Sequence, residues 1–126
     1  MGARTPEEID QLFMRALNAG DLDALVALYE PNASLTPQPG TTVTGTAAIR
    51  QALSGFIAGK PHIDITPRLV AQTGDLALLS AEWQLSITGP DGKPVQMSGK
   101  SVEVLRRQND GTWLFAIDEP FGVGAQ

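Results

Sequence analysis

The sequence predicts an α+β fold in which a curved antiparallel sheet wraps around N-terminal helices. In most of residues 5–59, apolar side chains recur with the 3.6-residue period of amphipathic helices. From residue 63 onward the period changes to two, as in half-buried strands, and glycine-containing turns separate the alternating segments. Helices followed by consecutive hairpins are typical of the α+β class, and twisted strands make such a sheet curl. A chain of 126 residues fits one domain, residues 1–126.

The first helix is predicted to start after Thr5. This start has the sequence of a capping box, with Thr5 as N-cap, Pro6 as the first helical residue and Glu8 reaching back to the Thr5 amide. Five apolar residues then follow the i, i+3, i+4, i+7, i+8 pattern of one helix face: Ile9, Leu12, Phe13, Ala16 and Leu17.

A glycine and an aspartate predict a sharp joint to a second helix. Gly20 suits the left-handed residue that ends a helix, and Asp21 suits the next N-cap. The second helix is expected to continue to Tyr29 and to end by about residue 31, with an apolar face formed by Leu22, Leu25, Val26 and Tyr29. Two helices joined so closely must share one apolar side, which makes them a lid that encloses a pocket over the sheet.

Two short strands and a third helix come next. We expect strands at residues 33–36 and 41–44, separated by the Pro- and Gly-rich residues 37–40. The third helix ends at Gly59 and has four apolar residues at helical spacing: Ile49, Leu53, Phe56 and Ile57.

The rest of the chain predicts a meander of longer strands. The first starts near residue 63, and Pro67 within it indicates a bulge or an edge position. Residues 79–87 alternate most regularly, residues 95–108 form a long strand and residues 113–119 form the last one. The curled sheet then forms a cone with one open mouth.

Composition disfavours several functional classes. The net charge is −5 and the densest basic feature is the pair Arg106-Arg107, so neither nucleic acid nor an anionic membrane is an expected partner. Without cysteine, disulfides and thiolate chemistry are excluded. No apolar run approaches the about 18 residues that span a membrane, and no signal peptide is recognisable. We therefore expect a cytoplasmic protein.

Two motifs carry a family resemblance. The segment Ala-Leu-Asn-Ala-Gly-Asp at residues 16–21, with Gly-Thr-Ala-Ala-Ile-Arg at residues 45–50, resembles ketosteroid-isomerase-like proteins of the nuclear transport factor 2-like superfamily, which includes SnoaL-like cyclases. The likeness extends over residues 5–122. It implies the cone-shaped fold and a homodimer formed through the outer sheet face, for which the alternating residues 79–87 leave room. Isomerases, dehydratases, cyclases, epoxide hydrolases and non-enzymes share this fold, so it says little about the reaction.

The residues of authentic steroid isomerases are mostly absent. Aligned without gaps on the first motif, the oxyanion-donating Tyr of that family falls on Phe13 and the Asp base falls on Pro37. Neither side chain can do this chemistry. The position of the protonated Asp falls within residues 101–104, where only Glu103 is acidic. Steroid isomerase activity is therefore not expected.

The final hairpin predicts a pair of facing acids, which are the candidate catalytic residues. If Asp110 and Gly111 form a two-residue type I′ turn, Glu103 lies directly opposite Asp118. Opposite residues on one sheet face have Cβ atoms about 5 Å apart, so one carboxyl pKa should rise. In an apolar cavity this yields a general acid or base near neutral pH. A three-residue turn would instead place the two acids on opposite faces.

Two positions for Asp118 remain open. A regular strand would place Asp118 on the face of Leu114 and Ala116, opposite Phe115. The resemblance to SnoaL-like sequences implies that this face lines the pocket. The alternative is a rim carboxylate that pairs with Arg68 or with the 106–107 arginine pair.

Further candidates would bind a ligand without reacting. Thr36 and Gln38 could form neutral hydrogen bonds with a ligand, and Tyr29 could present its hydroxyl group to the pocket. Met97 could form an adaptable apolar wall. Trp83 is expected either at the floor of the pocket or packed under the first helix. Phe13 is expected on the pocket wall or in the core. The single histidine, His62, is expected at the surface and excludes a multi-histidine metal site, and no acidic segment has the spacing of a calcium loop.

These expectations together predict a cofactor-independent pocket protein for a small, largely apolar molecule. The resemblance implies an isomerase- or cyclase-like reaction by carboxylate acid–base proton transfer. The alternatives are a non-catalytic binding protein and a dimeric assembly domain of the same fold.

Overall fold

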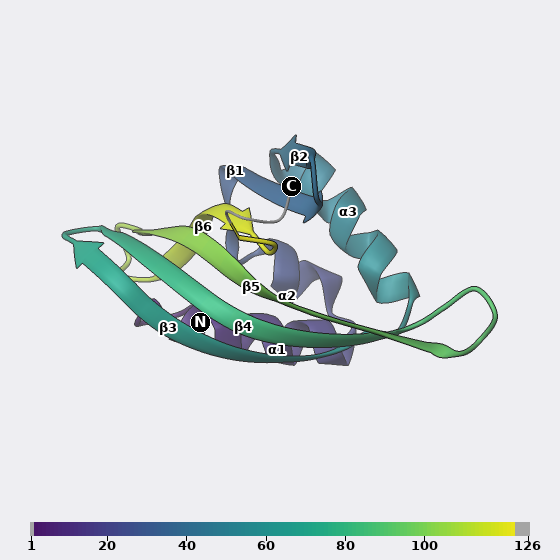
Figure 1. The fold of residues 1–126 in the computed structure, drawn as a ribbon. Coiled ribbons are helices and arrows are strands. Elements are labelled where there is room, and N and C mark those ends of the chain that lie inside the picture. Colours follow the sequence, from purple (N-terminus) through teal and green to yellow (C-terminus); the bar gives the residue numbers. More distant parts are fainter. Residues whose placement is uncertain (1, 123–126) are drawn as a thin grey trace.

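A curved six-stranded sheet wraps around three helices (Figure 1). The computed structural model describes residues 2–122. The helices are α1 (Glu8–Ala19), α2 (Leu22–Val26) and α3 (Thr46–Ala58). The strands follow the order β2-β1-β6-β5-β4-β3 in the sheet, with bounds β1 (Tyr29–Gln38), β2 (Thr41–Thr44), β3 (His62–Thr73), β4 (Leu76–Thr88), β5 (Pro94–Arg107) and β6 (Trp113–Glu119). Helix α1 packs on β3 and α3 on β1, which confirms the α+β cone.

The sheet is mixed, because β1 pairs with β6 in parallel. The prediction of a wholly antiparallel sheet was wrong at this one pairing. Tight turns fix the antiparallel direction of β3 to β6, and of β1 with β2. No hairpin joins β1 to β6, so nothing local in the sequence sets their relative direction.

The joint between α1 and α2 is as predicted. Gly20 has a left-handed backbone with φ of 70°, and the Asp21 side chain accepts a hydrogen bond from the Ala24 amide at 3.1 Å. Helix α2 is shorter than predicted, and Tyr29 is the first residue of β1 instead of the last of a helix. The helix ends because the Phe115 amide of β6 donates to the Leu28 carbonyl at 2.8 Å, which starts the sheet pairing.

The start of α1 contains half of the predicted capping box. The Thr5 hydroxyl accepts from the Glu8 amide at 3.3 Å, as expected. Glu8 accepts from the Arg4 amide at 2.6 Å rather than from Thr5, because Pro6 and Glu7 form a turn and the helix itself begins at Glu8.

Strand β4 lies at the centre of the three long strands, and its alternation is as predicted. Five of its side chains are buried on the inner face: Ala77, Leu79, Ala81, Trp83 and Leu85. These apolar side chains face the interior, so only the opposite, outer face of residues 79–87 is left for a contact with a second subunit. Beside it, the edge strand β3 contains Pro67 and a register shift between Leu69 and Ala71, so the proline marks an edge strand that also bulges.

In the last hairpin, Glu103 pairs with Asp118 as predicted, but the turn that connects the two strands differs from the predicted one. The turn is not the two-residue form, because the Gln108 amide donates to the Thr112 carbonyl at 2.7 Å and Arg107 pairs with Trp113. This register alone would separate the two acids. A bulge at residue 116 shifts the pairing by one, so Glu103 does lie opposite Asp118.

The bulge also changes which residues share the inner face of β6. Trp113, Phe115 and Asp118 are all buried, whereas Ile117 is 49% exposed. The expectation that Asp118 lies opposite Phe115 was wrong, since a bulge interrupts the two-residue alternation.

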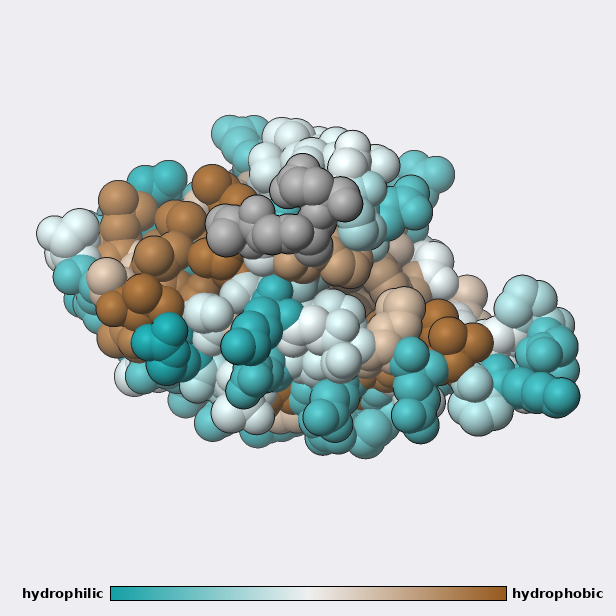
Figure 2. Space-filling view, viewed as in Figure 1, coloured by the Kyte–Doolittle hydropathy of each residue, from teal (hydrophilic) through white to brown (hydrophobic). Residues whose placement is uncertain are grey.

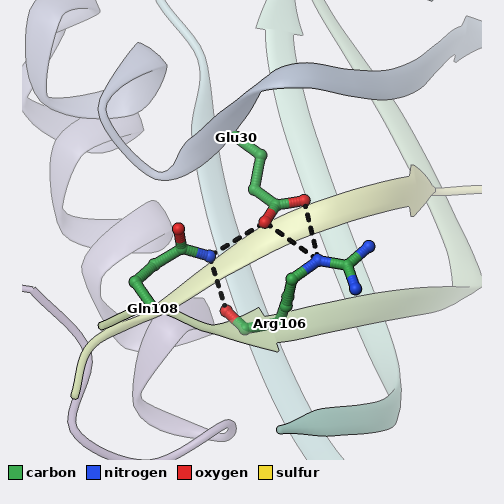
Figure 3. A network of polar contacts seen from close by, with 3 residues as sticks. All are labelled: Glu30, Arg106 and Gln108. Carbon is green, nitrogen blue, oxygen red and sulfur yellow. Dashed lines mark hydrogen bonds and ion pairs between the residues drawn. The ribbon is translucent and has the colours of Figure 1, made fainter. Parts of the chain in front are cut away.

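A polar network ties β1 to β5 across β6 (Figure 3). Arg106 Nε lies 3.1 Å from Glu30 Oε2, and Gln108 Nε2 donates to the same oxygen at 2.9 Å and to the Arg106 carbonyl at 3.1 Å. Glu30 directly follows Tyr29, so this network fixes the strand end that carries the Tyr29 hydroxyl. In the part of the chain that the structure describes, no helix has the length and apolar character needed to cross a bilayer.

Candidate functional site

A cavity of about 420 Å³ lies between the inner sheet face and the helices. This volume is within the range of small-molecule sites. Most of the wall is apolar and is formed by Phe13, Leu17, Leu35, Leu53, Phe56, Ile63, Ile65, Trp83, Leu85, Met97, Phe115 and Phe121. The polar wall residues include Asp10, Tyr29, Ser101, Glu103 and Asp118.

Three carboxyl groups from three elements meet at this cavity. Glu103 of β5 lies opposite Asp118 of β6, and Asp10 comes from the first turn of α1. Their residues are only 3%, 6% and 4% exposed, respectively. The Tyr29 hydroxyl donates to Asp118 Oδ2 at 2.5 Å. The tyrosine ring lies 4.9 Å from that of Phe115, which sets its position on the cavity wall.

The environment separates the pKa values of the three acids. Burial, followed by the charges of Asp118 and Asp10, raises the pKa of Glu103 to about 10. Burial and the charge of Asp118 raise the pKa of Asp10 to about 7. Burial raises the pKa of Asp118 only to about 6, because the Tyr29 hydrogen bond favours the ionised form. Burial and the Asp118 charge also raise the pKa of Tyr29 well above 10, so its hydroxyl stays a donor.

At neutral pH the site therefore holds both a carboxylic acid and a carboxylate. Glu103 keeps its proton, whereas Asp118 is mainly ionised. Titratable neighbours whose pKa values are pushed apart by their surroundings are what acid–base chemistry requires.

Two oxygens at the site have no hydrogen-bond partner among the described residues. They are Oδ2 of Asp10 and Oε1 of Glu103, and both atoms are buried. An unpartnered buried polar atom is costly, so these oxygens mark the place where a ligand or water would bind.

We expect Tyr29→Phe to raise the pKa of Asp118 above its value of about 6. The variant removes the hydroxyl that stabilises the carboxylate and keeps the ring that packs on Phe115. Carbon-13 NMR titration of the aspartate carboxyl signals measures the change. Ser101→Ala is the control, because the Ser101 hydroxyl donates to the Ala81 carbonyl at 3.4 Å and not to Asp118, so its loss should leave the Asp118 titration in place. A lower or unchanged Asp118 pKa in Tyr29→Phe would contradict this role.

The structure brings most of the candidate residues together. Phe13, Tyr29, Gln38, Trp83 and Met97 line the same cavity as the two acids. Trp83 also donates from Nε1 to the Pro120 carbonyl at 2.6 Å.

Two of the remaining candidates lie elsewhere. Thr36 is not a wall residue, since it is buried with its hydroxyl 3.1 Å from that of Thr42. The His62 side chain is 67% exposed, as expected. Asp118 is not a rim carboxylate, because it is buried, and the neighbouring arginines Arg106 and Arg107 pair with Glu30 and Asp75.

Asp10 is a site residue that the sequence did not predict. It shares its helix face with Phe13 and Leu17, three and seven residues further on, and all three line the cavity. An acidic residue in this apolar stripe was the available signal. Over residues 2–122, no three His, Cys, Asp or Glu side chains form a group that could hold a metal ion.

Comparison with known proteins places the chain in a family. Residues 11–115 match the family model described as a SnoaL-like domain. Similar solved structures include a nuclear transport factor 2-like superfamily protein from Salmonella enterica, at 15% identity and a TM-score of 0.78 over 90% of this chain and 84% of that one. A ketosteroid isomerase-like protein from Erwinia carotovora has 17% identity and a TM-score of 0.74, over 86% of both chains.

A third similar structure carries an enzyme name. It is a proposed dehydratase of the nuclear transport factor 2-like family from Streptomyces avermitilis, with 21% identity and a TM-score of 0.71 over 86% of this chain and 87% of that one. Identities this low establish the shared fold only. With the family match over most of its length, the chain belongs to the SnoaL-like domain family, and the structural matches show that it shares the fold of nuclear transport factor 2-like proteins.

Proposed function

We propose that this protein is a cofactor-independent catalyst of proton transfer on a small, largely apolar molecule. The observation that carries the proposal is the buried group of Asp118, Glu103 and Tyr29 on the wall of an otherwise mostly apolar cavity. The acid and the base lie opposite each other on adjacent strands, so both can reach one bound molecule.

Each acid has a distinct role in this reaction. The Asp118 carboxylate takes a proton from a carbon next to a carbonyl group, and the C–H electron pair becomes the C=C bond of an enol. The C=O electron pair moves onto the carbonyl oxygen, which takes the Glu103 proton, so the negative charge passes from Asp118 to Glu103 and the enol is neutral. Return of a proton to the same or another carbon completes an exchange or an isomerisation. Because Phe13 and Pro37 stand at the steroid isomerase positions, steroids are not the proposed substrates.

Deuterium incorporation tests this proposal without knowledge of the natural substrate. The protein is incubated in deuterium oxide with small cyclic ketones such as cyclohexanone and 2-tetralone, and mass spectrometry follows exchange beside the carbonyl. We expect Asp118→Asn to slow the exchange by about 10²- to 10⁴-fold. Asp64→Asn removes an exposed carboxyl and is the matched control. If the wild type does not accelerate exchange, or Asp118→Asn exchanges at the wild-type rate, the assignment is wrong.

A second function is a binding protein with no reaction, which the absence of the isomerase Tyr and Asp base favours. Such a protein would gain thermal stability with the same ketones and leave them undeuterated.

We also propose that a second copy of the chain covers an apolar patch on the outer sheet face. The patch consists of Leu78, Val104 and Ile117, which lie side by side across three strands, with Leu76 next to it. Leu76 is 39% exposed and Ile117 is 49% exposed. Figure 2 shows apolar side chains gathered at the end of the molecule where β3 meets β4 and near β6 in Figure 1. A contiguous apolar patch on the surface favours association.

Ile117→Lys should therefore convert a dimer into a monomer. The new charge would be buried in the interface, whereas in a monomer it would be half exposed and tolerated. Light scattering coupled to size-exclusion chromatography measures the mass. Gln84→Lys, an exposed position on the same face outside the patch, should leave the dimer intact. A monomeric wild type at tens of micromolar would overturn the dimer.

A further inference from the structure

We infer that the molecule bound in this cavity carries one protonated amine on an apolar body. The inference rests on the proposed function, because it assigns a ligand class to the same cavity. It depends on the charges of the wall and on the two buried oxygens that lack a partner.

The cavity wall carries acidic side chains and no basic ones. Asp10, Glu103 and Asp118 are wall residues, and the residues that line the cavity include no Lys, Arg or His. Among the described arginines, Arg106, Arg107 and Arg50 form ion pairs with acids outside the cavity. Nothing on the wall therefore offsets the negative charge that Asp118 and Asp10 acquire when they ionise. A cationic ligand would supply that charge, and an anionic one would be repelled.

The unpartnered oxygens require hydrogen-bond donors. An ammonium group has three N–H donors, so after donating to Asp10 Oδ2 it still has N–H groups for other oxygens of the wall, such as Oε1 of Glu103. An alcohol has only one O–H, and a ketone has no donor. Asp118 already accepts a hydrogen bond from the Tyr29 hydroxyl, so it needs a further donor less than Asp10 does. An ammonium group therefore supplies both the hydrogen-bond donors that these oxygens lack and the positive charge that the wall lacks.

The apolar wall limits the rest of the ligand. Phe13, Trp83 and Phe115 line the cavity with the acids, so apart from the amine and the carbonyl group of the proposed reaction, the body of the ligand should be apolar and in contact with those rings. Such a ligand buries one charge next to its counter-charge and transfers its remaining surface out of water.

Binding of a cation should also release protons. The groups facing Asp10 are Asp118 and Glu103, with the Tyr29 hydroxyl behind Asp118 and Glu119 next to Asp118 in the chain. A bound ammonium favours the ionised form of each carboxyl group, which lowers its pKa. Since the pKa of Asp10 is about 7 before a cation binds, amine affinity should increase between pH 5.5 and pH 8.

Three isosteric probes test the inference: cyclohexylmethylamine, cyclohexylmethanol and cyclohexanecarboxylate. Titration calorimetry at pH 8 should show the amine binding at least ten times more tightly than the alcohol, with no detectable binding of the carboxylate. Titrations in buffers of different ionisation enthalpy should show proton release with the amine alone. Asp10→Asn should lose the preference for the amine and retain the alcohol, whereas Asp64→Asn should behave as wild type.

The possible results separate this inference from the proposed function. Equal or tighter binding of the alcohol would contradict the inference that the ligand carries an amine. An amine preference that survives in both Asp10→Asn and Glu103→Gln would contradict it as well. Failure of all three probes to bind would overturn it as well. Ketone deuteration that depends on Asp118 would in either case leave the proton-transfer proposal standing. Amine binding without any ketone deuteration would support the ligand class and contradict the proton-transfer proposal.

Discussion

At pH 8, Asp10→Asn is expected to raise the free energy of unfolding, on the order of 1–3 kcal/mol. Burial and the Asp118 charge raise the pKa of Asp10 to about 7 in the folded protein. The unfolded value is about 4. The folded protein therefore binds more protons than the unfolded chain between about pH 4 and pH 7, and its stability falls as the pH rises through this window. Asparagine carries no charge and removes this loss.

Urea denaturation of both proteins at pH 4.5 and pH 8 measures the effect. The gain from Asp10→Asn should be small at pH 4.5, where Asp10 is protonated in the folded protein, and largest at pH 8. The exposed Asp64→Asn variant should show no comparable pH dependence. A variant less stable than wild type at pH 8 would mean that Asp10 has a stabilising partner. That result would contradict the absence of a hydrogen-bond partner for Asp10 Oδ2 among the described residues. A stabilising substitution at a buried acid is the behaviour expected of a residue retained for function.

Phe115→Ala is expected to reduce the free energy of unfolding by about 3–5 kcal/mol, a loss typical of a large buried aromatic residue. Phe115 is 1% exposed, packs edge-to-face on Phe13 at 6.2 Å and lies against Tyr29. Its loss enlarges the cavity and frees the tyrosine ring, so Asp118 should also lose part of its hydrogen bond. Urea denaturation measures the stability, and carboxyl NMR reports the Asp118 titration.

The control for this variant lies two residues further along the same strand. Ile117→Ala removes a side chain that is 49% exposed on the outer face and should cost much less, about 0.5 kcal/mol in the monomer. If both substitutions had similar effects, the inner and outer faces of β6 would not differ as described.

The fold could be predicted from the sequence wherever a local signal specifies a local structure. Gly20 and Asp21 fix the joint between the helices, and the alternation in β4 fixes its buried face. The length of α2 could not be predicted, because Tyr29 fits a helix pattern and pairs instead with β6, 86 residues later. The parallel pairing of β1 with β6 has the same cause, since such contacts depend on the whole fold.

Only part of the site could be predicted, again because some of its contacts follow from local sequence and others depend on the whole fold. The pairing of Glu103 with Asp118 was correct, although the turn and the strand face were wrong and the bulge at residue 116 compensated for them. Nothing in the sequence of β6 marks that bulge. Asp10 lies 93 residues before Glu103, so its place beside the pair depends on how α1 packs on the sheet. The acidic residue in an apolar helix face was visible, but its partners were not.

The bulged, proline-containing strand β3 forms one open border of the sheet. A border strand of 12 residues presents free backbone groups that could recruit further copies of the chain and seed fibrils. Pro67 lacks an amide hydrogen, Arg68 adds charge, and the kink after Leu69 bends the border away from the flat geometry that stacking needs. Concentrated protein should therefore remain free of ordered aggregates, and replacing Pro67 with valine would remove one of these protections.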